Sequence, residues 1–581
     1  MIKKFAHYLG GYKKLLIVIP IMVFLDSLAE LSMPLLMAKV VDIGIPAKDV
    51  SFITRTGVYM ILLALAAITL GIVNMRFTTV ASMGFGANLR NALFEKVQSF
   101  SFNNIDRFST GSLITRLTND ANNLQLTVMM GLRILMRAPM MLTIAFFMAY
   151  SINAELSLVL AIAIPLLIVG IVLVMKTAVT RFSVMQKKID ALNNTLQENL
   201  IGIRVVKSYV REDHEIGKFK GANDDLTNAG IRAVSIAILN MPIMMLVMNF
   251  ATMAIIWLGG NMVVAGSLGA GELISFISYV FQILFSVMMI SMVILMSARA
   301  EASGRRILEV LETQSDIAEP QDPVRPDASS RRGKVEFKNV SFKYHSLDSG
   351  DDVLQNISFT AQPGQVVGIV GGTGTGKTTL VHLIPRLYDV SGGAVLVDDV
   401  DVREYPLQVL RDKVGVVLQK NTLFSGTIRE NLLWGNPNAT QEEIEAASKD
   451  AQAHDFIMSF PEGYETQLGQ GGVNVSGGQK QRLCIARAML KKPEILILDD
   501  STSAVDTGTE AKIRTSFYHN LANTTVIIIA QRISSVMEAD QILVLDDGKI
   551  NGMGTHAELM ANNPIYQEIY TSQLEGAFIH E

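Results

Sequence analysis

The sequence predicts a bundle of membrane-spanning helices followed by an α/β domain, and two observations carry this prediction. Of the 581 residues, 49% are hydrophobic and only 18% are charged, whereas soluble chains average about 25% charged residues. The apolar excess lies almost wholly before residue 300. After residue 333, short β-rich runs alternate with helical ones, which is typical of a mostly parallel sheet covered on both faces. This composition excludes a disordered chain and argues against a wholly soluble one.

Six apolar runs precede residue 300, and a helix needs roughly 20 such residues to cross the bilayer core. The runs are Leu15–Val41, Thr56–Met75, Ala138–Ala154, Leu156–Met175, and one within each of the segments 233–271 and 273–298. No barrel-like alternation accompanies them, and only helices and closed barrels satisfy their backbone in hydrocarbon. We therefore expect six transmembrane helices.

The basic residues predict the orientation of these helices. Segments 76–126 and 176–232 contain five and ten Lys or Arg residues, whereas the intervening loops contain only Lys48 and Arg55. By the positive-inside rule, both long segments and both termini are cytoplasmic. The first apolar run has no small-residue cleavage site, so we expect a retained span and not a signal peptide.

We divide the chain into a transmembrane domain at 1–310, a linker at 311–333 and an α/β domain at 334–581. The linker is polar, and the stretch 315–332 contains three prolines and no periodicity. The two long basic segments contain no proline and have helical periodicity. We therefore expect the spans to continue as helices into the cytoplasm.

Charge and cysteine content exclude several classes of protein. The net charge is −4 and the pI is near 6.1, so no basic field favours nucleic acid as a partner. The single cysteine, Cys484, excludes an intramolecular disulfide and a cysteine cluster for zinc.

Residues 371–378 match the phosphate-binding pattern G-x-x-x-x-G-K-[ST] between an apolar strand and a helical run. Glycines let the backbone amides turn toward phosphate oxygens, and the following helix N-terminus favours negative charge. Lys377 is expected to reach the β- and γ-phosphates of ATP, and the Thr378 hydroxyl to bind Mg²⁺. The predicted nucleotide contacts here are Gly371, Gly372, Thr373, Gly374, Thr375, Gly376, Lys377, Thr378 and Thr379.

A second motif is the apolar run Ile495–Leu498, which ends in Asp499. An acid at the carboxyl end of a buried strand, after such a loop, is placed to hold the Mg²⁺ shell. Between the two motifs lies Val475-Ser476-Gly477-Gly478-Gln479. Its small residues and hydroxyl before a helical run suit a second phosphate-binding helix N-terminus.

This last run resembles the signature motif of ATP-binding cassette (ABC) proteins, whose usual form is LSGGQ. Tyr344 resembles the aromatic that stacks on adenine, Gln419 the glutamine that links the γ-phosphate region and Mg²⁺ to the membrane domain, and Ser503–Asp506 the D-loop. With six preceding spans, nearly the whole chain is similar to an ABC exporter half-transporter.

The resemblance implies a bacterial cell (inner) membrane protein that works as a dimer with ATP and Mg²⁺ as cofactors. In that family, ATP lies between the P-loop of one subunit and the signature motif of the other, here Ser476, Gly477, Gly478 and Gln479. It also implies coupling helices in the long cytoplasmic segments, which we place near 103–109 and 208–214.

Two positions depart from the family pattern. Asp500 stands where the family usually has the glutamate that polarises the attacking water, and Gln531 stands where it has the switch histidine. Asp is shorter by one methylene, roughly 1.5 Å, and a well-placed general base contributes about 10²–10⁴ in rate. Glutamine binds phosphate but cannot become cationic. With Gln419, these two residues form our predicted catalytic set.

The pairing of Asp500 and Gln531 with an intact SGGQ resembles the degenerate-site subunit of heterodimeric bacterial multidrug exporters. It implies a partner half-transporter that carries Glu and His at these positions, and drug-like or lipid-like amphiphiles as substrates. A homodimeric ABC lipid flippase and a nucleotide-gated regulatory subunit remain as alternatives. The sequence does not identify the transported substrate.

Two acids in the first span, Asp26 and Glu30, are four residues apart and share a helix face. Ionisable groups at membrane depth usually face a bundle interior or water. We expect them either to line the translocation cavity or to form a structural pair with Arg133, Arg137 or Lys39.

Overall fold

The computed structural model describes residues 2–324, 333–344, 352–520 and 523–578. Its contacts divide the chain into two compact units. The first comprises Met1–Gln98 and Gly111–Glu312, and the second comprises Ser99–Thr110 and Thr313–Glu581. Of the predicted linker 311–333, residues 325–332 lie outside the described residues.

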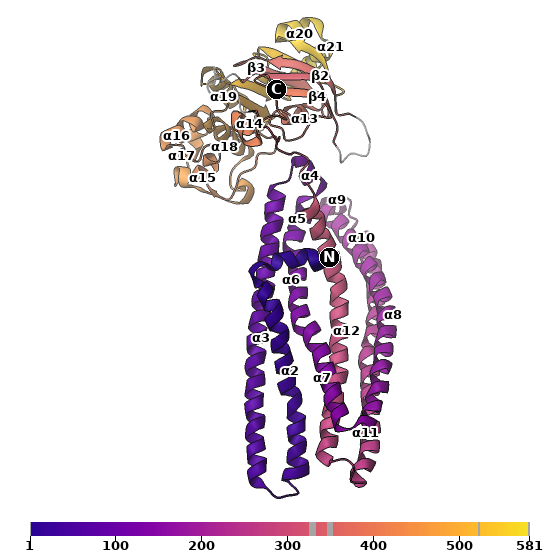
Figure 1. Cartoon of the computed structure of the whole chain (residues 1–581). Helices are drawn as coiled ribbons and strands as arrows, with labels where there is room; N and C mark the ends of the chain where they lie inside the picture. The colour runs from indigo at the N-terminus through magenta and orange to yellow at the C-terminus, as the bar shows by residue number, and fades with distance from the viewer. Residues whose placement is uncertain (1, 325–332, 345–351, 521–522, 579–581) are drawn as a thin grey trace. The chain divides into compact units, whose positions relative to one another are not determined.

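The first unit is entirely helical in its described part (Figure 1). Six of its helical segments are long and apolar enough to cross a membrane, which confirms the predicted number of spans. The main helices are α2 (Leu15–Lys39), α3 (Val50–Gln98), α7 (Met136–Ile152), α8 (Ala154–Ile201), α10 (Glu212–Ile238), α11 (Asn240–Val264) and α12 (Ala270–Glu312). Shorter helical segments are α1 (Ile2–Phe5), Ala6–Lys14, α5 (Thr110–Thr115), α6 (Ala121–Met130) and α9 (Ile203–Ser208), with π-turns at Val40–Gly44, Arg116–Asp120 and η4 (Gly131–Leu135).

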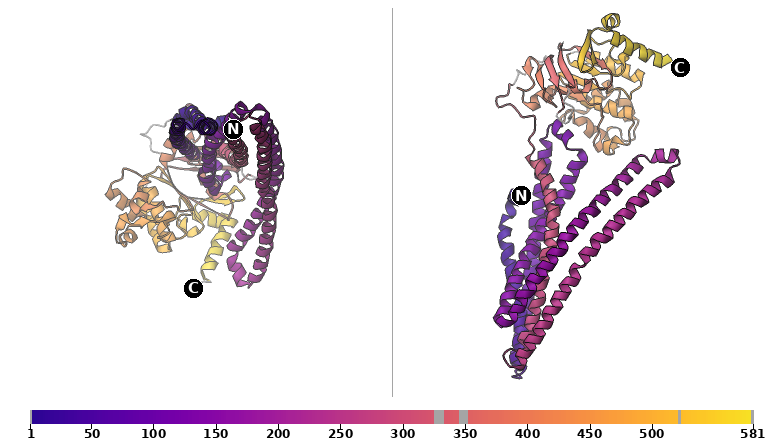
Figure 2. Two further views of the ribbon diagram at one scale, coloured as in Figure 1. Left: turned by 90° about the horizontal axis from the view of Figure 1, so that it is seen from below. Right: turned by 90° about the vertical axis from the view of Figure 1, so that its right-hand side faces the viewer.

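Apolar side chains hold the bundle together at two clusters. One joins α2, α3 and η4 through Ile19, Val23, Ala81 and Leu132, and a larger one joins α7, α8, α11 and α12. Helices α8 and α10 run side by side and diverge from the other helices toward α9 (Figure 2). The Asp42 carboxylate accepts from the backbone amides of Gly271 and Glu272 at 2.7 and 2.9 Å, which stabilises the first turn of α12.

The short helix α9 lies beside the segment 208–214, where we expect a coupling helix. It ends at Ser208, and the predicted range covers a turn and the start of α10. Gly202 interrupts the helical run before α9, and Val210 adopts a φ of 51° that ends it. Glu212, Asp213 and Glu215 then favour a new helix start, because acids stabilise a helix N-terminus.

The second unit contains the short helix α4 (Phe102–Arg107) and the α/β domain. Six strands form a sheet in the order β12-β11-β3-β10-β9-β6, with only β12 antiparallel to its neighbour. The strands are β3 (Val366–Gly371), β6 (Val414–Val417), β9 (Ile495–Asp499), β10 (Thr525–Ile529), β11 (Gln541–Asp546) and β12 (Lys549–Gly554). A second, antiparallel sheet has the order β2-β1-β4-β5, with β1 (Val335–Phe342), β2 (Leu354–Ala361), β4 (Gly392–Val397) and β5 (Val400–Asp401). A two-stranded ladder pairs β7 (Gly426–Thr427) with β8 (Gln467–Leu468).

Alternate residues of the six-stranded sheet enter two separate cores. On β9, Leu496 and Leu498 belong to one core and Ile495 and Ile497 to the other, as expected for a strand with period two. The first core includes α15 (Ile428–Leu433), α16 (Gln441–Asp450), α17 (His454–Met458), α18 (Gly477–Leu490), α19 (Thr507–Asn520), α20 (His556–Asn562) and α21 (Pro564–Phe578). The second includes the antiparallel sheet, α13 (Lys377–His382) and α14 (Leu407–Lys413). Both faces are therefore covered, which explains why these strands are continuously apolar.

Candidate functional site

The predicted site residues follow the carboxyl ends of four adjacent strands. The P-loop, residues 371–378, follows β3, and Gln531 follows β10. Asp499 is the last residue of β9 and Asp500 follows it, while Gln419 follows β6. Because β3, β10, β9 and β6 are neighbours and mutually parallel, their carboxyl ends meet at one edge of the sheet. This edge is where open α/β sheets bind ligands.

Glycine is required where the P-loop enters α13. Gly376 adopts a φ of 89°, and a Cβ there would lie 2.8 Å from Leu354 Cδ2. Gly374 also adopts a left-handed φ, 84°, but a Cβ at this position would have no other atom within 4 Å. A side chain at either position strains the backbone. At Gly374 the open space leaves room for a ligand to approach the main chain.

The Lys377 ammonium lies within the loop that precedes it. Its Nζ donates to the carbonyl oxygens of Gly371 and Gly372 at 2.9 and 2.6 Å. Burial lowers the pKa of Lys377, while the nearby Asp500 and Asp499 carboxylates act in the opposite direction. The side chain is thus held at the loop, with a positive charge available to a phosphate.

Thr378 and Asp499 come together beside the P-loop. The Thr378 hydroxyl donates to Asp499 Oδ1 at 3.0 Å, and Asp499 is only 1% exposed. Burial raises the pKa of Asp499. Its Oδ2 is buried with no hydrogen-bond partner among the described residues, and His382 Nε2, whose pKa burial lowers, lies 4.0 Å away.

A hydroxyl and an unpartnered carboxylate oxygen are the donor types that suit Mg²⁺. Within the described ranges, no group of three His, Cys, Asp or Glu residues is placed to enclose a metal ion. Mg²⁺ is commonly held by one or two protein oxygens together with substrate phosphates. The residues at this edge therefore fit a metal that arrives with a nucleotide.

Asp500 and Gln531, the two positions that depart from the family pattern, contact each other. Gln531 Nε2 donates to Asp500 Oδ2 at 2.6 Å, and the Asp500 amide donates to Ile529 O at 3.1 Å. Burial raises the pKa of Asp500, and hydrogen bonds from Gln419 and Gln531 oppose that shift. The three residues predicted as catalytic thus form one hydrogen-bonded group around the Asp500 carboxylate.

Tyr344 lies beside the same loop. Its hydroxyl is 2.9 Å from Thr379 Oγ1, and its ring packs edge-on against Phe342 and Tyr388. Burial raises the pKa of Tyr344. The contact with Thr379 joins two residues predicted to bind nucleotide, although they are 35 positions apart.

The signature residues begin α18 and are used to cap it. Ser476 Oγ accepts from the Gln479 amide at 3.3 Å, and Gln479 Oε1 accepts from the Ser476 amide at 2.8 Å. Gln481, one turn inside the helix, bonds Ser503 and the Ala504 amide at 3.2 and 2.9 Å. In the part of this chain that the structure describes, no hydrogen bond or ion pair joins Ser476–Gln479 to the P-loop.

The contact between α4 and the α/β domain was not found from the sequence. Tyr388 Oη donates to Asp106 Oδ2 at 2.6 Å, and Phe102 packs edge-on against the same ring. Burial and the bond to Asp106 both raise the pKa of Tyr388. The predicted coupling segment 103–109 overlaps α4, but nothing in its sequence names Tyr388 as its partner, because 282 positions separate the two residues.

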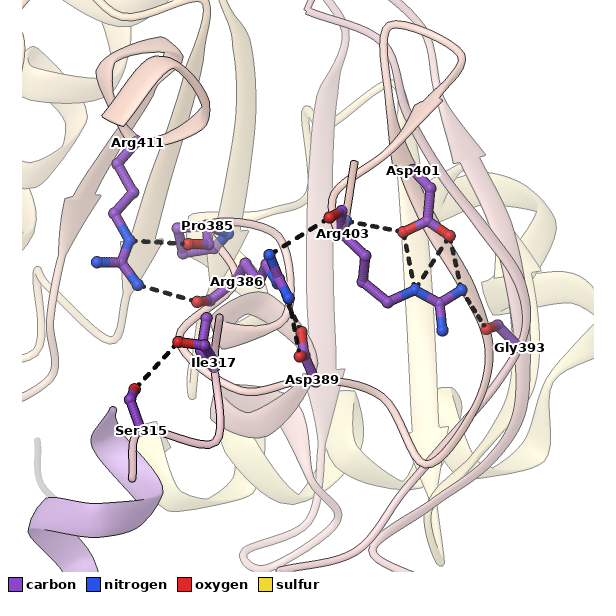
Figure 3. A network of polar contacts seen from close by, with 9 residues as sticks. All are labelled: Ser315, Ile317, Pro385, Arg386, Asp389, Gly393, Asp401, Arg403 and Arg411. Atoms are coloured by element: carbon purple, nitrogen blue, oxygen red, sulfur yellow. Dashed lines mark hydrogen bonds and ion pairs between the residues drawn. The ribbon is translucent and has the colours of Figure 1, made fainter. Parts of the chain in front are cut away.

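Arginines brace the turn at residues 385–389, which contains Tyr388, and Figure 3 shows their bonds. Arg386 is 5% exposed and adopts a φ of 51°, and its guanidinium donates to Asp389 at 2.7 and 3.1 Å. Arg411 donates to the carbonyls of Pro385 and Arg386 at 3.3 and 3.0 Å. Paired arginine–carboxylate bonds are strong and directional, so this turn is a rigid support for Tyr388.

Two family models match the chain in the order of its two parts. The model described as ABC transporter transmembrane region matches residues 16–288, and the model described as ABC transporter matches residues 354–503. An ABC transporter ATP-binding protein of Bacillus subtilis, YfiB, whose function is uncharacterized, is 40% identical over 98% of this chain and 98% of its own. The chain belongs to the ABC transporter family.

Other comparisons agree with this assignment. This ABC transporter chain is 35% identical to the ATP-dependent lipid A-core flippase of Syntrophus aciditrophicus, over 84% of this chain and 80% of the flippase. Its fold matches the ATP-bound structure of a bacterial Atm1-family ABC exporter with a TM-score of 0.81, covering 97% of this chain and 99% of the other at 24% identity. The predicted fold class is confirmed, and so is the resemblance to a transmembrane domain fused to an ATP-binding domain. The chain is an ATP-driven membrane transporter.

Proposed function

We propose that this chain is one subunit of a dimeric ATP-driven exporter and binds ATP at the edge formed by β3, β10, β9 and β6. Lys377 supports this proposal because its ammonium lies at the loop, ready to exchange two carbonyl oxygens for phosphate oxygens. Thr378 and Asp499 would hold Mg²⁺, which neutralises charge on the phosphates. Tyr344 would stack on the adenine. The observation that carries the proposal is the unpartnered Asp499 Oδ2 beside Thr378, as found among the described residues.

We further propose that this chain's own site hydrolyses ATP slowly. A general base must accept a proton from the attacking water within hydrogen-bond reach. The Asp500 carboxylate instead accepts from Gln531 at 2.6 Å, and its short side chain keeps it near β9. Gln531 in turn cannot supply a positive charge to the γ-phosphate. The hydrogen bond between Asp500 and Gln531 therefore keeps both side chains in positions that allow ATP to bind but slow its hydrolysis.

A partner half-transporter with Glu and His at these positions would restore turnover. The capped N-terminus of α18, with Ser476 and Gly477 exposed, would then meet the ATP bound to the partner's P-loop. Support for this arrangement is that the signature residues make no bond to the P-loop of their own chain within its described part. The assembly would have one slow and one fast site.

The tip formed by α9 and its flanking turns supports dimerisation. Several large apolar side chains there are exposed: Leu200, Ile201, Val205, Tyr209 and Val210. Tyr209 and Val210 are 74% and 80% exposed, and this tip follows the C-terminal end of α8, beyond the apolar run Leu156–Met175. Apolar groups gathered in this way mark an interaction surface. We propose that α9 and α4 are the two coupling helices and that α9 packs on the partner's ATP-binding domain.

The transported molecule is proposed to be a drug-like or lipid-like amphiphile moved out of the cytoplasm or the inner leaflet of a bacterial inner membrane. The distribution of Lys and Arg supports a cytoplasmic ATP-binding domain. A homodimeric lipid flippase is the second candidate, because a relative named as a lipid A-core flippase is 35% identical. Asp500 counts against it, since a homodimer would contain two slow sites.

The test compares the purified full-length chain alone with the same chain co-purified with a second half-transporter that carries Glu and His. We expect slow ATP hydrolysis from the chain alone and fast hydrolysis from the pair. Lys377→Ala should weaken nucleotide binding at this chain's site, whereas Lys449→Ala, an exposed lysine on α16, should not. Fast, cooperative hydrolysis and transport by the chain alone would favour the homodimer.

A further inference from the structure

A cavity with a volume of about 410 Å³ lies inside the first unit, between α2, η4, α7, α11 and α12. Four methionines and two phenylalanines make up most of its apolar wall, among them Met244, Met248 and Phe285. Methionine side chains are flexible and polarizable and adapt to ligands of irregular shape. A volume of this size suits a drug-sized ligand, for which sites measure about 300–1,000 Å³.

Two acids near this cavity share one arginine as their ion-pair partner. Arg137 lies 3.3 Å from Asp26 Oδ2 and 2.5 Å from Glu30 Oε2. Of the two outcomes expected for these acids, the structural pair with Arg137 is therefore found, and Glu30 also lines the cavity. A cationic ligand would have to compete with a guanidinium that both carboxylates hold.

Arg133 is the charged residue of the wall that has no such partner. It lines the cavity from the π-turn η4, and among the described residues it makes no hydrogen bond or ion pair. π-turns are often found at functional sites in helices. A charge within a membrane-spanning bundle is costly unless it is paired or reaches water.

A second polar group of the wall is also unsatisfied. Gln282 Oε1 on α12 is buried and has no hydrogen-bond partner in the described part of the chain. Leaving such an acceptor unbonded costs about 1–3 kcal/mol. Arg133 therefore offers donors and Gln282 offers an acceptor, within an otherwise apolar wall.

We propose that this cavity binds an amphiphile through its anionic group, a carboxylate or phosphate, held by Arg133, with a neighbouring hydroxyl or amide of the ligand donating to Gln282. The apolar body of the ligand packs against the methionines and phenylalanines. This inference rests on the proposed export function, for which it names the substrate class. The Asp26–Arg137–Glu30 group holds the wall in place and takes no part in recognising the anion.

Binding of two probes with the same tail tests the proposal: dodecyl phosphate and dodecyltrimethylammonium. Affinities are measured by equilibrium titration of the full-length chain in an uncharged maltoside detergent, without nucleotide. Arg133→Gln should weaken dodecyl phosphate binding by about tenfold or more, because one charge-assisted hydrogen bond is lost. It should leave dodecyltrimethylammonium binding unchanged.

Control variants separate the effect of the Arg133 charge from that of the apolar cavity wall. Arg55→Gln removes an arginine of α3 that does not line the cavity, and it should change neither affinity. Met248→Gln should weaken both probes. Inorganic phosphate should not compete with dodecyl phosphate at equal concentration, since the tail supplies much of the affinity; equal competition would indicate a site for free phosphate and would overturn the proposal.

ATP binding is measured on the same samples so that two failures can be told apart. If ATP binds normally but dodecyl phosphate binding is absent, or is unaffected by Arg133→Gln, the anionic-substrate proposal is wrong and the proposed function stands. Tighter binding of the ammonium probe than of the phosphate probe would also overturn it. Loss of ATP binding in the unmodified chain would instead contradict the proposed function.

Discussion

Gln531 Nε2 lies 2.6 Å from Asp500 Oδ2, so the two residues that depart from the ABC transporter pattern are joined by one hydrogen bond. The contact follows from the sheet. β9 and β10 are parallel neighbours with Asp499 opposite Ile529, and each departing residue lies within two positions of that pair. One substitution therefore alters the surroundings of the other, and the two are expected to act together.

The first prediction is that this coupling appears in hydrolysis. Asp500→Glu combined with Gln531→His should raise the ATPase rate at this site by tenfold or more, within the range of about 10²–10⁴ that a general base contributes. Either change alone should give much less, because the new group still faces an unsuited neighbour. Steady-state ATPase of the dimer measures the effect. Asp455→Glu, on an exposed part of α17, is the matched control, and additive single effects would contradict the coupling.

Whether a part of this site could be predicted depends on how far apart its contacting residues lie in the sequence. The P-loop, Asp499 and the signature residues are local patterns, and strand order then places the P-loop and Asp499 at one edge. The Tyr388–Asp106 bond spans 282 positions, and no periodicity encodes such a pair. The antiparallel sheet was also missed, since its two longest strands, β1 and β2, alternate buried with exposed or half-buried residues and form no continuous apolar run. The bounds of α9 were not predicted, because Gly202 and the left-handed Val210 decide where that helix begins and ends.

The second prediction concerns the cost of the buried Asp499 carboxylate. Burial raises its pKa in the folded chain, so the folded state binds more protons than the unfolded one between the two pKa values. Stability is then greatest below the unfolded pKa and falls as pH rises through the folded pKa. Asp499→Asn removes this cost and should raise the thermal midpoint of the nucleotide-free chain at pH 8, by about 2–4 °C per kcal/mol regained.

The same variant should lose the stabilisation that ATP with Mg²⁺ provides. Thermal unfolding at pH 5.5 and pH 8, with and without Mg²⁺-ATP, measures both effects. The gain from Asp499→Asn should shrink at the lower pH, because a raised pKa lets the native carboxyl take up protons as the pH falls. A lower midpoint at pH 8 without nucleotide would show that the carboxylate is stabilised by partners, against the observation that its Oδ2 has none among the described residues.

The third prediction is that Tyr388 holds α4 in place. Tyr388→Phe keeps the ring contacts and removes only the bond to Asp106, a hydrogen bond to a charged group that contributes about 1.5–3 kcal/mol. Amide hydrogen exchange within Ser101–Phe108 should accelerate by about tenfold or more. Tyr405→Phe removes another buried hydroxyl, which donates to Val397 O at 2.9 Å, and should leave exchange in α4 unchanged.

A double-mutant cycle completes that test. Asp106→Asn in the Tyr388→Phe background should add little, because the pair shares one interaction. Fully additive effects would mean that Tyr388 and Asp106 stabilise α4 independently of each other.

The fourth prediction separates the two arginines of the membrane cavity. Arg137→Gln leaves Asp26, which is 4% exposed, without its counter-charge, and breaking a buried ion pair costs about 3–5 kcal/mol. The thermal midpoint of the full-length chain should fall. Asp26→Asn in the same chain should recover most of the loss, whereas Arg133→Gln alone should have little effect on stability. Equal losses from the two arginine variants would contradict the assignment of Arg137 as the structural partner.

The last prediction is that the two ATP sites of the assembly respond unequally. In the proposed heterodimer Asp500 serves poorly as a base, so Asp500→Asn should reduce the ATPase rate only slightly. Replacing the partner's glutamate by Gln should abolish it, because the only fast site is lost.

Ser476→Ala should also slow hydrolysis, since the proposed fast site is completed by this chain's α18, and removal of its cap also frees the Gln479 amide. The matched change in the partner's signature motif affects only the slow site and should be tolerated. ATPase rates of the four variants, each in a dimer with one unmodified subunit, measure the asymmetry. Equal loss from Asp500→Asn and from the partner's substitution would mean two equivalent sites, and the homodimeric exporter would then be the better description.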